Sequence, residues 1–420
     1  MKQLSDYNFF STEVLECPYE FYKLARENSP VMELPSELVG GKLFLVTSYD
    51  LVKQILLNVE VFSSHFFHLL AGKEVQSPEV QEIAAQGWPP VNTLLTADPP
   101  EHERFRSLVN QAFTTYRVNK MEGHIKLIVD ELIDSLIDKG ECEFISSFAV
   151  PLPLKVIARQ LGVPPEDLPK FKKWSDSSIA RLGRRLSKEQ ELECALDVLA
   201  LQRYLNEVIE QCRKQPGDDL ITDLVQAKVE GQRPLDTAEL ISIIQQLLVA
   251  GNETITNALA GGMLLLIQNP QQMALVQEAP DRLENLVEEV LRLETPTAGM
   301  WRIVKKDTEL AGVAIPEGSV LLLRFDSANR DSKIFPYGEH FEVGRSNAAN
   351  HLAFGHGIHF CVGAALARKE MLVAYGQLLR RLKNIRLAAG KNDLTHFPNV
   401  LMRGLKHLYI EFEEADARLK

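Results

Sequence analysis

The stretch Thr237–Gln268 limits the fold of this chain more than any other segment. Its apolar residues recur at a helical period, and a rise of 1.5 Å per residue gives a helix of about 48 Å. A helix of that length crosses a whole domain, so the remaining elements have to pack around it. Residues 150–275 are almost entirely helical in period, with breaks at Pro164-Pro165, Pro216-Gly217 and Pro234.

Strand patterns are short and lie outside this helical region. Runs rich in β-branched and aromatic residues predict strands at 42–48, 301–305, 308–310, 319–325, 383–390 and 406–413. No Pro/Gly/Ser linker, low-complexity block or internal repeat divides the 420 residues. We therefore expect one mainly α domain over residues 1–420, with a small β region.

Composition excludes several classes of protein. The net charge of −11 argues against a nucleic-acid-binding protein, which needs a basic surface. Five scattered cysteines without CxxC spacing fit a reducing compartment. The first ten residues contain no apolar signal segment, and the apolar run Ala258–Ile267 is too short to cross a bilayer. We expect a soluble, cytoplasmic protein.

The segment Phe354–Gly363 places Cys361 in a loop rich in glycine and aromatic residues, directly before an apolar run that reads as a helix. Nearby backbone N–H groups, a helix N-terminus and an apolar wall all favour a thiolate that ligates a metal. Haem iron suits a lone cysteine. Two other interpretations remain open from the loop alone: a buried cysteine that only fills space, and a zinc site formed with His351, His356 and His359.

A second constellation lies in the middle of the long helix. In the run Ala250-Gly251-Asn252-Glu253-Thr254, a glycine inside a helix costs roughly 1 kcal/mol relative to alanine, and close approach of a flat cofactor would justify it. Thr254 can hydrogen-bond a helix carbonyl and open a groove for O2. Glu253 can deliver protons. By itself, the pattern is equally that of an ordinary buried stripe with one exposed acid.

Two further patterns involve charged residues. Glu289 and Arg292 are three apart on a helix with apolar neighbours, so a buried ion pair is plausible, and a common exposed surface pair is the alternative. His102 and Arg106 are four apart and share one helix face, where two donors suit an anionic group. A solvated charged face is the alternative for this second pair.

The pattern Phe-Gly-x-Gly-x-His-x-Cys-x-Gly, matched at every fixed position from Phe354 to Gly363, resembles the haem-binding signature of the cytochrome P450 family. The Glu253-Thr254 pair, the Glu289/Arg292 pair and the His102 segment follow the family's order over about residues 98–368. The resemblance, to the soluble bacterial branch, implies a P450-type fold. In that fold the haem lies between the long central helix and the Cys loop.

The resemblance assigns roles to individual residues. Cys361 is the expected iron ligand of haem b (iron protoporphyrin IX), Thr254 and Glu253 manage protons, and Arg345 joins Glu289 and Arg292 in a structural triad. The residues expected at the cofactor are His102 and Arg106 on one propionate, Arg302 and His359 on the other, and Ala250, Phe354, Gly355 and Gly363.

The implied activity is that of a monooxygenase, a hydroxylase that inserts one oxygen atom of O2 into an unactivated C–H bond or a double bond. Electrons are expected from a separate ferredoxin or flavodoxin-like protein, with Arg104, Lys120, Arg368 and Lys369 offering cations to it. Two alternatives are a peroxide-driven peroxygenase, against which the Glu253-Thr254 pair argues, and a non-catalytic haem-binding sensor or carrier.

The substrate wall is expected to be apolar. Ile243, Gln246 and Leu247 share the helix face of Thr254. The resemblance adds Ala298, Gly299, Met300, Val400 and Leu401, with Trp88–Leu95 as a lid. These residues predict a medium to large hydrophobic substrate, such as a terpenoid, steroid or fatty acid. Gln246 either binds an oxygen of that substrate or turns aside to a neighbouring helix.

Overall fold

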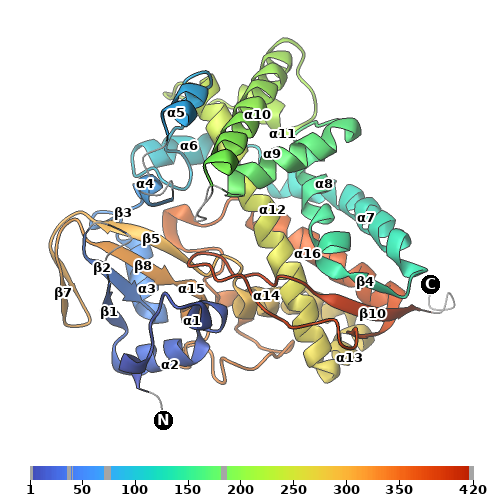
Figure 1. Cartoon of the computed structure of the whole chain (residues 1–420). Helices are drawn as coiled ribbons and strands as arrows, with labels where there is room; N and C mark the ends of the chain where they lie inside the picture. Colours follow the sequence, from blue (N-terminus) through green and yellow to red (C-terminus); the bar gives the residue numbers. More distant parts are fainter. Residues whose placement is uncertain (1–2, 36–38, 40, 71–76, 181–186, 416–420) are drawn as a thin grey trace. The chain divides into compact units, whose positions relative to one another are not determined.

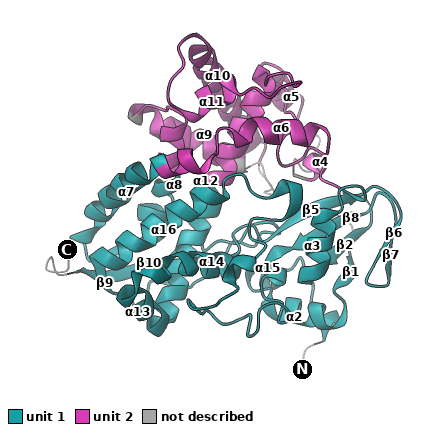
Figure 2. Cartoon of the chain, turned by 180° about the vertical axis from the view of Figure 1, so that it is seen from behind, with its two compact units in different colours: residues 1–62, 120–153, 253–420 teal, residues 63–119, 154–252 magenta. Residues whose placement is uncertain are grey.

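The apolar stretch at residues 237–268 forms a single helix, α12 (Thr237–Gln268), with the predicted ends (Figure 1). The computed structural model describes residues 3–35, 39, 41–70, 77–180 and 187–415. These fall into two compact units: unit 1 comprises residues 1–62, 120–153 and 253–420, and unit 2 comprises 63–119 and 154–252 (Figure 2). Because the boundary falls at 252/253, α12 contributes residues to both units.

Unit 1 holds the described strands and many of the helices. Its helices are α1 (Thr12–Glu16), α2 (Tyr19–Asn28), α3 (Tyr49–Leu57), α13 (Pro270–Glu278), α14 (Leu283–Glu294), α15 (Phe325–Ala328) and α16 (Ala364–Arg381). Short 3-10 turns are η1 (Leu4–Asp6), η4 (Pro280–Arg282), η5 (Ala348–Asn350) and η6 (Gly357–His359), and η2 (Ile145–Ala149) is a π-helix. Helices α7 (Thr115–Ile137) and α8 (Pro151–Gln160), like α12, contribute to both units.

The largest sheet has the strand order β1-β2-β8-β5-β3. Its strands are β1 (Val31–Leu34), β2 (Leu43–Val46), β3 (Phe62–Ser63), β5 (Gly299–Val304) and β8 (Val320–Arg324). Strands β2 and β8 pair in parallel, with Leu43 opposite Val320, although 277 residues separate them. Every residue of β2 and of β8 is buried, as expected for strands covered on both faces.

Two smaller sheets complete the β region. One has the order β4-β10-β9, formed by β4 (Glu141–Glu143), β9 (Leu382–Leu387) and β10 (Tyr409–Glu414), and the other pairs β6 (Thr308–Leu310) with β7 (Val313–Ile315). A cluster of buried apolar side chains, including Phe44, Val46 and Leu321, connects the large sheet to α3 and α15. The prediction of a mainly helical fold with a small β region is confirmed.

Apart from Ser63 of β3, the regular elements described in unit 2 are helices joined by loops. It contains α4 (Phe67–Leu70), α5 (Pro78–Ala84), α6 (Glu101–Asn110), η3 (Pro165–Asp167), α9 (Leu168–Ala180), α10 (Lys188–Lys214) and α11 (Leu220–Gln226). Ser187 begins α10 with a capping box, in which its hydroxyl accepts from the N–H of Gln190. Among the described residues of the whole chain, no helix combines the length and apolar character that a membrane span needs.

The predicted triad around Glu289 forms a buried ionic network in unit 1. Arg292 donates to both carboxylate oxygens of Glu289, at 2.7 and 2.8 Å, and Arg345 donates to Oε1 at 3.0 Å. The remaining N–H groups of Arg292 donate to the backbone carbonyls of Asn329, Gly338 and His340. Because donors and acceptors are matched, the charges can remain buried, and α14 is tied to the irregular segment 329–345.

Candidate functional site

The cysteine loop connects η5 to α16 within unit 1. Gly355 and Gly357 have φ angles of +70° and +74°, which side chains other than glycine adopt only with strain. A Cβ on Gly357 would also lie 2.8 Å from the carbonyl oxygen of Leu56, so this glycine lets the loop pack closely on the end of α3. The loop closes where the N–H of Cys361 donates to the carbonyl of Phe354 at 2.9 Å.

Cys361 is exposed, and α16 begins three residues after it. The interpretation of Cys361 as a buried space-filler is therefore wrong. Among the residues that the structure describes, no group of three His, Cys, Asp or Glu side chains is placed to hold a metal ion, which argues against zinc. One thiolate donor beside the partly exposed ring of Phe360 fits haem, because the porphyrin would itself supply most of the iron's ligands.

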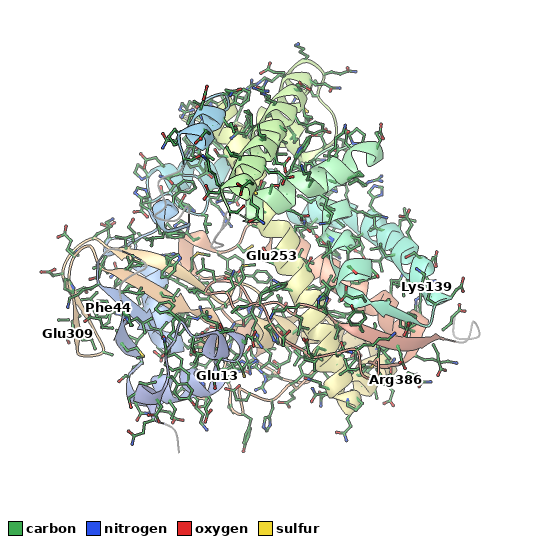
Figure 3. All side chains as sticks on the ribbon, viewed as in Figure 1. Glu13, Phe44, Lys139, Glu253, Glu309 and Arg386 are labelled. Carbon is green, nitrogen blue, oxygen red and sulfur yellow. The ribbon has the colours of Figure 1, made fainter. Side chains whose placement is uncertain are left out.

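The residues expected above the cofactor lie in the middle of α12, where Figure 3 labels Glu253. Glu253 and Thr254 are the first residues of the unit 1 part of this helix, and both are half-buried. Ala250 is exposed, and a Cβ added to Gly251 would meet nothing within 4 Å. No neighbouring atom of the chain would clash with a side chain at Gly251, so crowding within the protein does not explain this glycine. The open space beside it is compatible with a flat cofactor.

The four expected propionate ligands belong to three elements. His102 and Arg106 lie on α6 in unit 2, Arg302 on β5 in unit 1, and His359 in the cysteine loop. His102 and Arg302 are 1% and 4% exposed, respectively, which favours specific roles over a solvated charged face. Arg302 also donates to the carbonyl of Trp301 at 2.7 Å. The assignment to propionates stays a prediction.

The substrate-wall residues of unit 1 come together at one end of β5. The N–H of Ala298 donates to the carbonyl of Leu401 at 2.8 Å, and the guanidinium of Arg324 donates to the carbonyl of Val400. Ala298 is buried, whereas Met300, Val400 and Leu401 are half-buried. The 298–300 and 400–401 segments are therefore held side by side, as a common wall requires.

The substrate-wall residues of unit 2 lie along α12, where Ile243 is fully buried and Leu247 is 8% exposed. Gln246 is half-buried, and its side-chain carbonyl accepts from the hydroxyl of Thr93 at 3.5 Å. Gln246 thus contacts the loop before α6, rather than the neighbouring helix that the second alternative named. That contact engages the amide oxygen.

The same loop is fastened to two helices of unit 2. The side-chain amide of Gln202 in α10 accepts from the N–H of Trp88 at 3.0 Å and donates to the Trp88 carbonyl at 3.1 Å. Ser242 of α12 accepts from the N–H of Val91 at 3.0 Å. The sequence analysis did not identify Gln202 or Ser242. Their partners are 114 and 151 residues away, and no local pattern marks them.

Three of the cations expected to attract an electron carrier are engaged within the chain. Arg104 donates to both oxygens of Glu239, at 2.8 and 2.9 Å. Arg368 donates to both oxygens of Glu288, at 2.6 and 2.9 Å. Lys369 pairs with Glu122 at 2.7 Å. The net positive charge offered to a partner is therefore smaller than the sequence suggests, and we do not retain this patch as a docking site.

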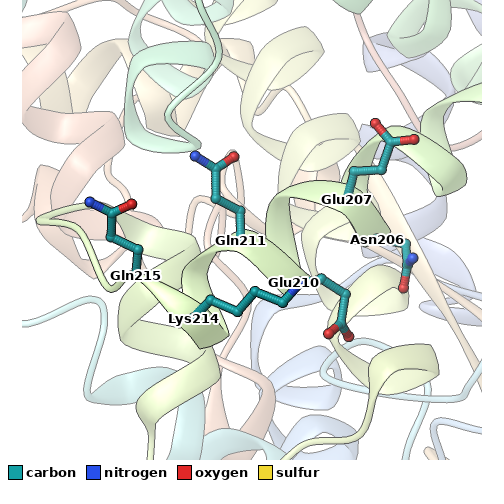
Figure 4. Close-up of a pocket in the computed structure, with 6 residues that line it drawn as sticks. All are labelled: Asn206, Glu207, Glu210, Gln211, Lys214 and Gln215. Atoms are coloured by element: carbon teal, nitrogen blue, oxygen red, sulfur yellow. The ribbon is translucent and has the colours of Figure 1, made fainter.

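A hollow of about 440 Å³ opens beside the C-terminal half of α10 (Figure 4). Its lining comes from this helix and the residue after it: Asn206, Glu207, Glu210, Gln211, Lys214 and Gln215. The lining is polar and charged and includes none of the predicted site residues. We assign it no part in the chemistry, because apolar walls with a few placed polar groups are typical of small-molecule sites.

Comparison with known proteins agrees with these features. The family model described as "Cytochrome P450" matches residues 186–409. The 6-deoxyerythronolide B hydroxylase of Saccharopolyspora erythraea is 35% identical over 94% of this chain and 96% of its own length. The steroid C26-monooxygenase of Mycobacterium tuberculosis H37Rv is 37% identical over 97% and 96%. The structure of cytochrome P450 CYP109Q5 from Chondromyces apiculatus superposes with a TM-score of 0.86, at 33% identity over 98% of this chain and 99% of the other.

Proposed function

The chain belongs to the cytochrome P450 family and is a haem-thiolate monooxygenase, and we propose that it oxidises a medium to large hydrophobic substrate. The observation that supports a thiolate site in this chain is the conformation of the Phe354–Gly363 loop. Two glycines at positive φ present one exposed cysteine, three residues before the start of α16. We propose Cys361 as the axial ligand, with haem b as the cofactor.

Bound haem supplies the activation of O2 at its iron, and the chain supplies the setting for that chemistry. We propose that Phe354, Gly355 and Gly363, which lie in the same loop as Cys361, exclude water from the thiolate when haem is bound. Nearby N–H groups would stabilise the thiolate, the form in which the sulfur can serve as an iron ligand. Ala250 offers a small side chain where the helix would approach the cofactor.

We propose that Glu253 and Thr254 move protons. The carboxylate of Glu253 is half-buried, so it can exchange protons with solvent and pass them inward. The hydroxyl of Thr254, on the next residue, can donate a proton and accept another. The four donors His102, Arg106, Arg302 and His359 would neutralise the propionates, since charge-assisted hydrogen bonds to carboxylates are the strongest available to them.

The proposed substrate is a steroid, a terpenoid or a fatty acid that carries at least one oxygen acceptor. The wall residues Ala298, Met300, Val400, Leu401, Ile243 and Leu247 are apolar, so binding would come mainly from buried area, at about 25 cal/mol per Å². Gln246 is the polar exception. Because Thr93 binds its amide oxygen, its NH2 group is oriented away from Thr93, and we propose that it donates to the substrate oxygen.

The names of two relatives support a bulky substrate, since one acts on a steroid and the other on 6-deoxyerythronolide B. We further propose that electrons come from a separate ferredoxin or flavodoxin-type protein. The segment Trp88–Leu95 is proposed as the lid over the substrate. Its attachment to α10 and α12 through Gln202, Ser242 and Gln246 supports that role.

The proposal is tested by incubating the haem-loaded protein with a reductant, a surrogate ferredoxin and its reductase, isotopically labelled O2, and a panel of steroids, terpenoids and fatty acids. We expect one labelled oxygen atom per product molecule, with reductant consumption that depends on the substrate. Product formation from hydrogen peroxide alone would identify a peroxygenase. Ligand-induced spectral shifts without any turnover across the panel would favour a sensor or carrier.

A further inference from the structure

Glu288 is next to Glu289 on α14 but serves a different cluster. Glu289 holds Arg292 and Arg345, whereas the two carboxylate oxygens of Glu288 accept from Nε and Nη2 of Arg368, which lies on α16. Nε2 of His351 lies 3.2 Å from Oε2 of the same carboxylate. Two adjacent acids of one helix therefore reach two different parts of unit 1.

The protonation of His351 follows from its contacts. Its Nδ1 accepts from the N–H of Ala353 at 3.1 Å, so the ring proton is on Nε2 and faces Glu288. Burial lowers the pKa of His351, which keeps the ring neutral. Burial would raise the pKa of Glu288, but hydrogen bonds from Arg368 and His351 outweigh it and lower the pKa to about 2. The cluster is an ionised carboxylate between a cation and a neutral N–H donor.

Both partners of Glu288 pack against Phe354, the first residue of the cysteine loop. The guanidinium carbon of Arg368 lies 4.5 Å from the centre of the Phe354 ring, and the ring of His351 lies 5.6 Å from it. The carbonyl of Phe354 in turn accepts from the N–H of Cys361. A continuous series of contacts thus runs from Glu288, through Arg368 and His351, to Phe354 and Cys361.

Short-range backbone hydrogen bonds shape the loop from within. Within it, the N–H of Gly355 donates to Leu352, that of Phe360 to Gly357 and that of Cys361 to Phe354. Each of these bonds is local, and Gly355 and Gly357 give the unfolded loop unusual freedom. The ring of Phe354 contacts Arg368 of α16 and the nearby His351, both of which contact Glu288, and so connects the loop to α14 and α16.

We propose that Glu288 is a positioning residue for the iron ligand: by holding Arg368 and His351 against Phe354, it keeps the Cys361 thiolate in place. The proposal rests on the proposed role of Cys361. Loss of the cluster frees the ring of Phe354 and lets the loop shift, so that the sulfur of Cys361 leaves the position in which it would hold the iron.

Three variants of the haem-loaded protein test this. E288Q removes the charge but keeps one acceptor oxygen. R368K keeps the positive charge and loses the planar fork that both binds a carboxylate with two hydrogen bonds and stacks on a ring. K369Q is the matched control: the neighbouring residue, paired with Glu122 rather than Glu288. The readouts are the rate at which the reduced carbon monoxide complex loses its thiolate band in mild denaturant, and the haem reduction potential.

We expect the thiolate band to decay at least about tenfold faster in E288Q and in R368K than in the parent, since each loses a charge-assisted hydrogen bond. K369Q should stay within about twofold, as is typical of exposed pairs. The potential should move in the first two variants only. If E288Q does not fold, the decay rate and the reduction potential of R368K test the proposal.

Parent-like decay and potential in either E288Q or R368K would overturn the proposal, because it requires both the carboxylate and the planar guanidinium. Equal acceleration in K369Q would overturn it as well, since the effect would then belong to the surface of α16. Absence of the thiolate band from the parent itself would instead show that the assignment of Cys361 is wrong.

Discussion

The segment that supports the cysteine and the segment proposed as the lid are held by different kinds of interaction. Charged pairs predominate on α14, the helix whose Glu288 binds Arg368 beside the cysteine loop and whose Glu289 and Arg292 have no exposed side-chain surface. The lid at Trp88–Leu95 is fastened by neutral bonds from Gln202, Ser242 and Gln246. A charge-assisted bond contributes about twice as much as a neutral one. The comparison predicts a rigid support for the metal ligand and a more easily opened lid.

The largest effect is expected from Arg292→Leu, which tests the rigid side. It leaves the Glu289 carboxylate without its bidentate partner and frees three backbone carbonyls that Arg292 binds. Removing one member of a buried ion pair costs about 3–5 kcal/mol, enough to abolish folding or haem incorporation. Arg386→Leu, in the exposed pair with Glu411, is the control and should cost less than about 1 kcal/mol. If chemical denaturation shows that Arg292→Leu and Arg386→Leu lose equal free energy of unfolding, the distinction between the two regions does not hold.

A second test uses a carboxyl on the same side of the molecule that lacks such partners. Glu370 on α16 is 2% exposed, its Oε2 has no hydrogen-bond partner among the described residues, and burial raises its pKa from 4.5 to about 8. The folded protein therefore holds a proton that the unfolded chain releases. Stability should fall as pH rises from about 4.5 to about 8, and then level off.

Glu370→Gln should abolish that slope and stabilise the protein by a few kcal/mol at pH 8, with little change at pH 4.5. Thermal unfolding at a series of pH values measures this. The control is Glu278→Gln, a change at an exposed residue of α13. If the stabilities of Glu370→Gln and of the parent change with pH in the same way, Glu370 is ionised in the folded state or hydrated.

Thr254 belongs to neither the ionic support nor the lid. Its variant therefore tests a role in the reaction without disturbing either structural region. Thr254→Ala should keep haem and substrate binding close to the parent but divert reductant into hydrogen peroxide. The loss of one placed hydroxyl costs about 1–2 kcal/mol of selectivity, or roughly a tenfold change in the ratio of product to peroxide. Parallel assays of reductant, peroxide and product measure the coupling. A substrate hydroxyl can replace the missing one, so unchanged coupling with two different substrates is the result that contradicts the role.

The smallest effect concerns the lid. Gln202→Leu removes both hydrogen bonds to the backbone of Trp88, each neutral and contributing about 1 kcal/mol. We expect stopped-flow spectral titration to show faster entry and release of a large ligand, by about fivefold, with little change in affinity. Gly87→Ala should act similarly, because its Cβ would lie 2.1 Å from Oε1 of Gln202.

Gln211→Leu supplies the control for the lid, since it makes the same chemical change at an exposed position further along α10. If the three variants bind ligand at the parent's rates, the loop is not a barrier to entry. If Gln211→Leu speeds ligand entry and release as much as Gln202→Leu does, and Gly87→Ala does not, the effect arises from the stability of α10 rather than from the lid.

Local patterns account for what could be predicted from the sequence. The helical period gave α12 with both ends correct, and the motif around Cys361 identified the loop. Strands β1, β3, β4 and β7 were not predicted, since each is only two to four residues long. Short strands carry too little pattern and depend on their partners.

Contacts between distant segments account for the rest. The pairing of β2 with β8, the binding of Arg368 to Glu288 and the attachment of Trp88 to Gln202 join residues 80 to 277 positions apart. Periodicity reports only which face of an element is apolar, so it cannot identify such partners. For the same reason, the sequence suggested Arg368 as a docking cation, although Glu288 binds it.

The central claim is that Cys361 binds haem iron as a thiolate, and the optical spectrum of the reduced carbon monoxide complex tests it most directly. The parent should show the red-shifted band of a thiolate-ligated haem. Cys361→Ser should lose that band and reductant-driven turnover while keeping most of its helical content, because a hydroxyl is a far weaker anionic donor. Retention of the band and of full turnover in Cys361→Ser would contradict the account.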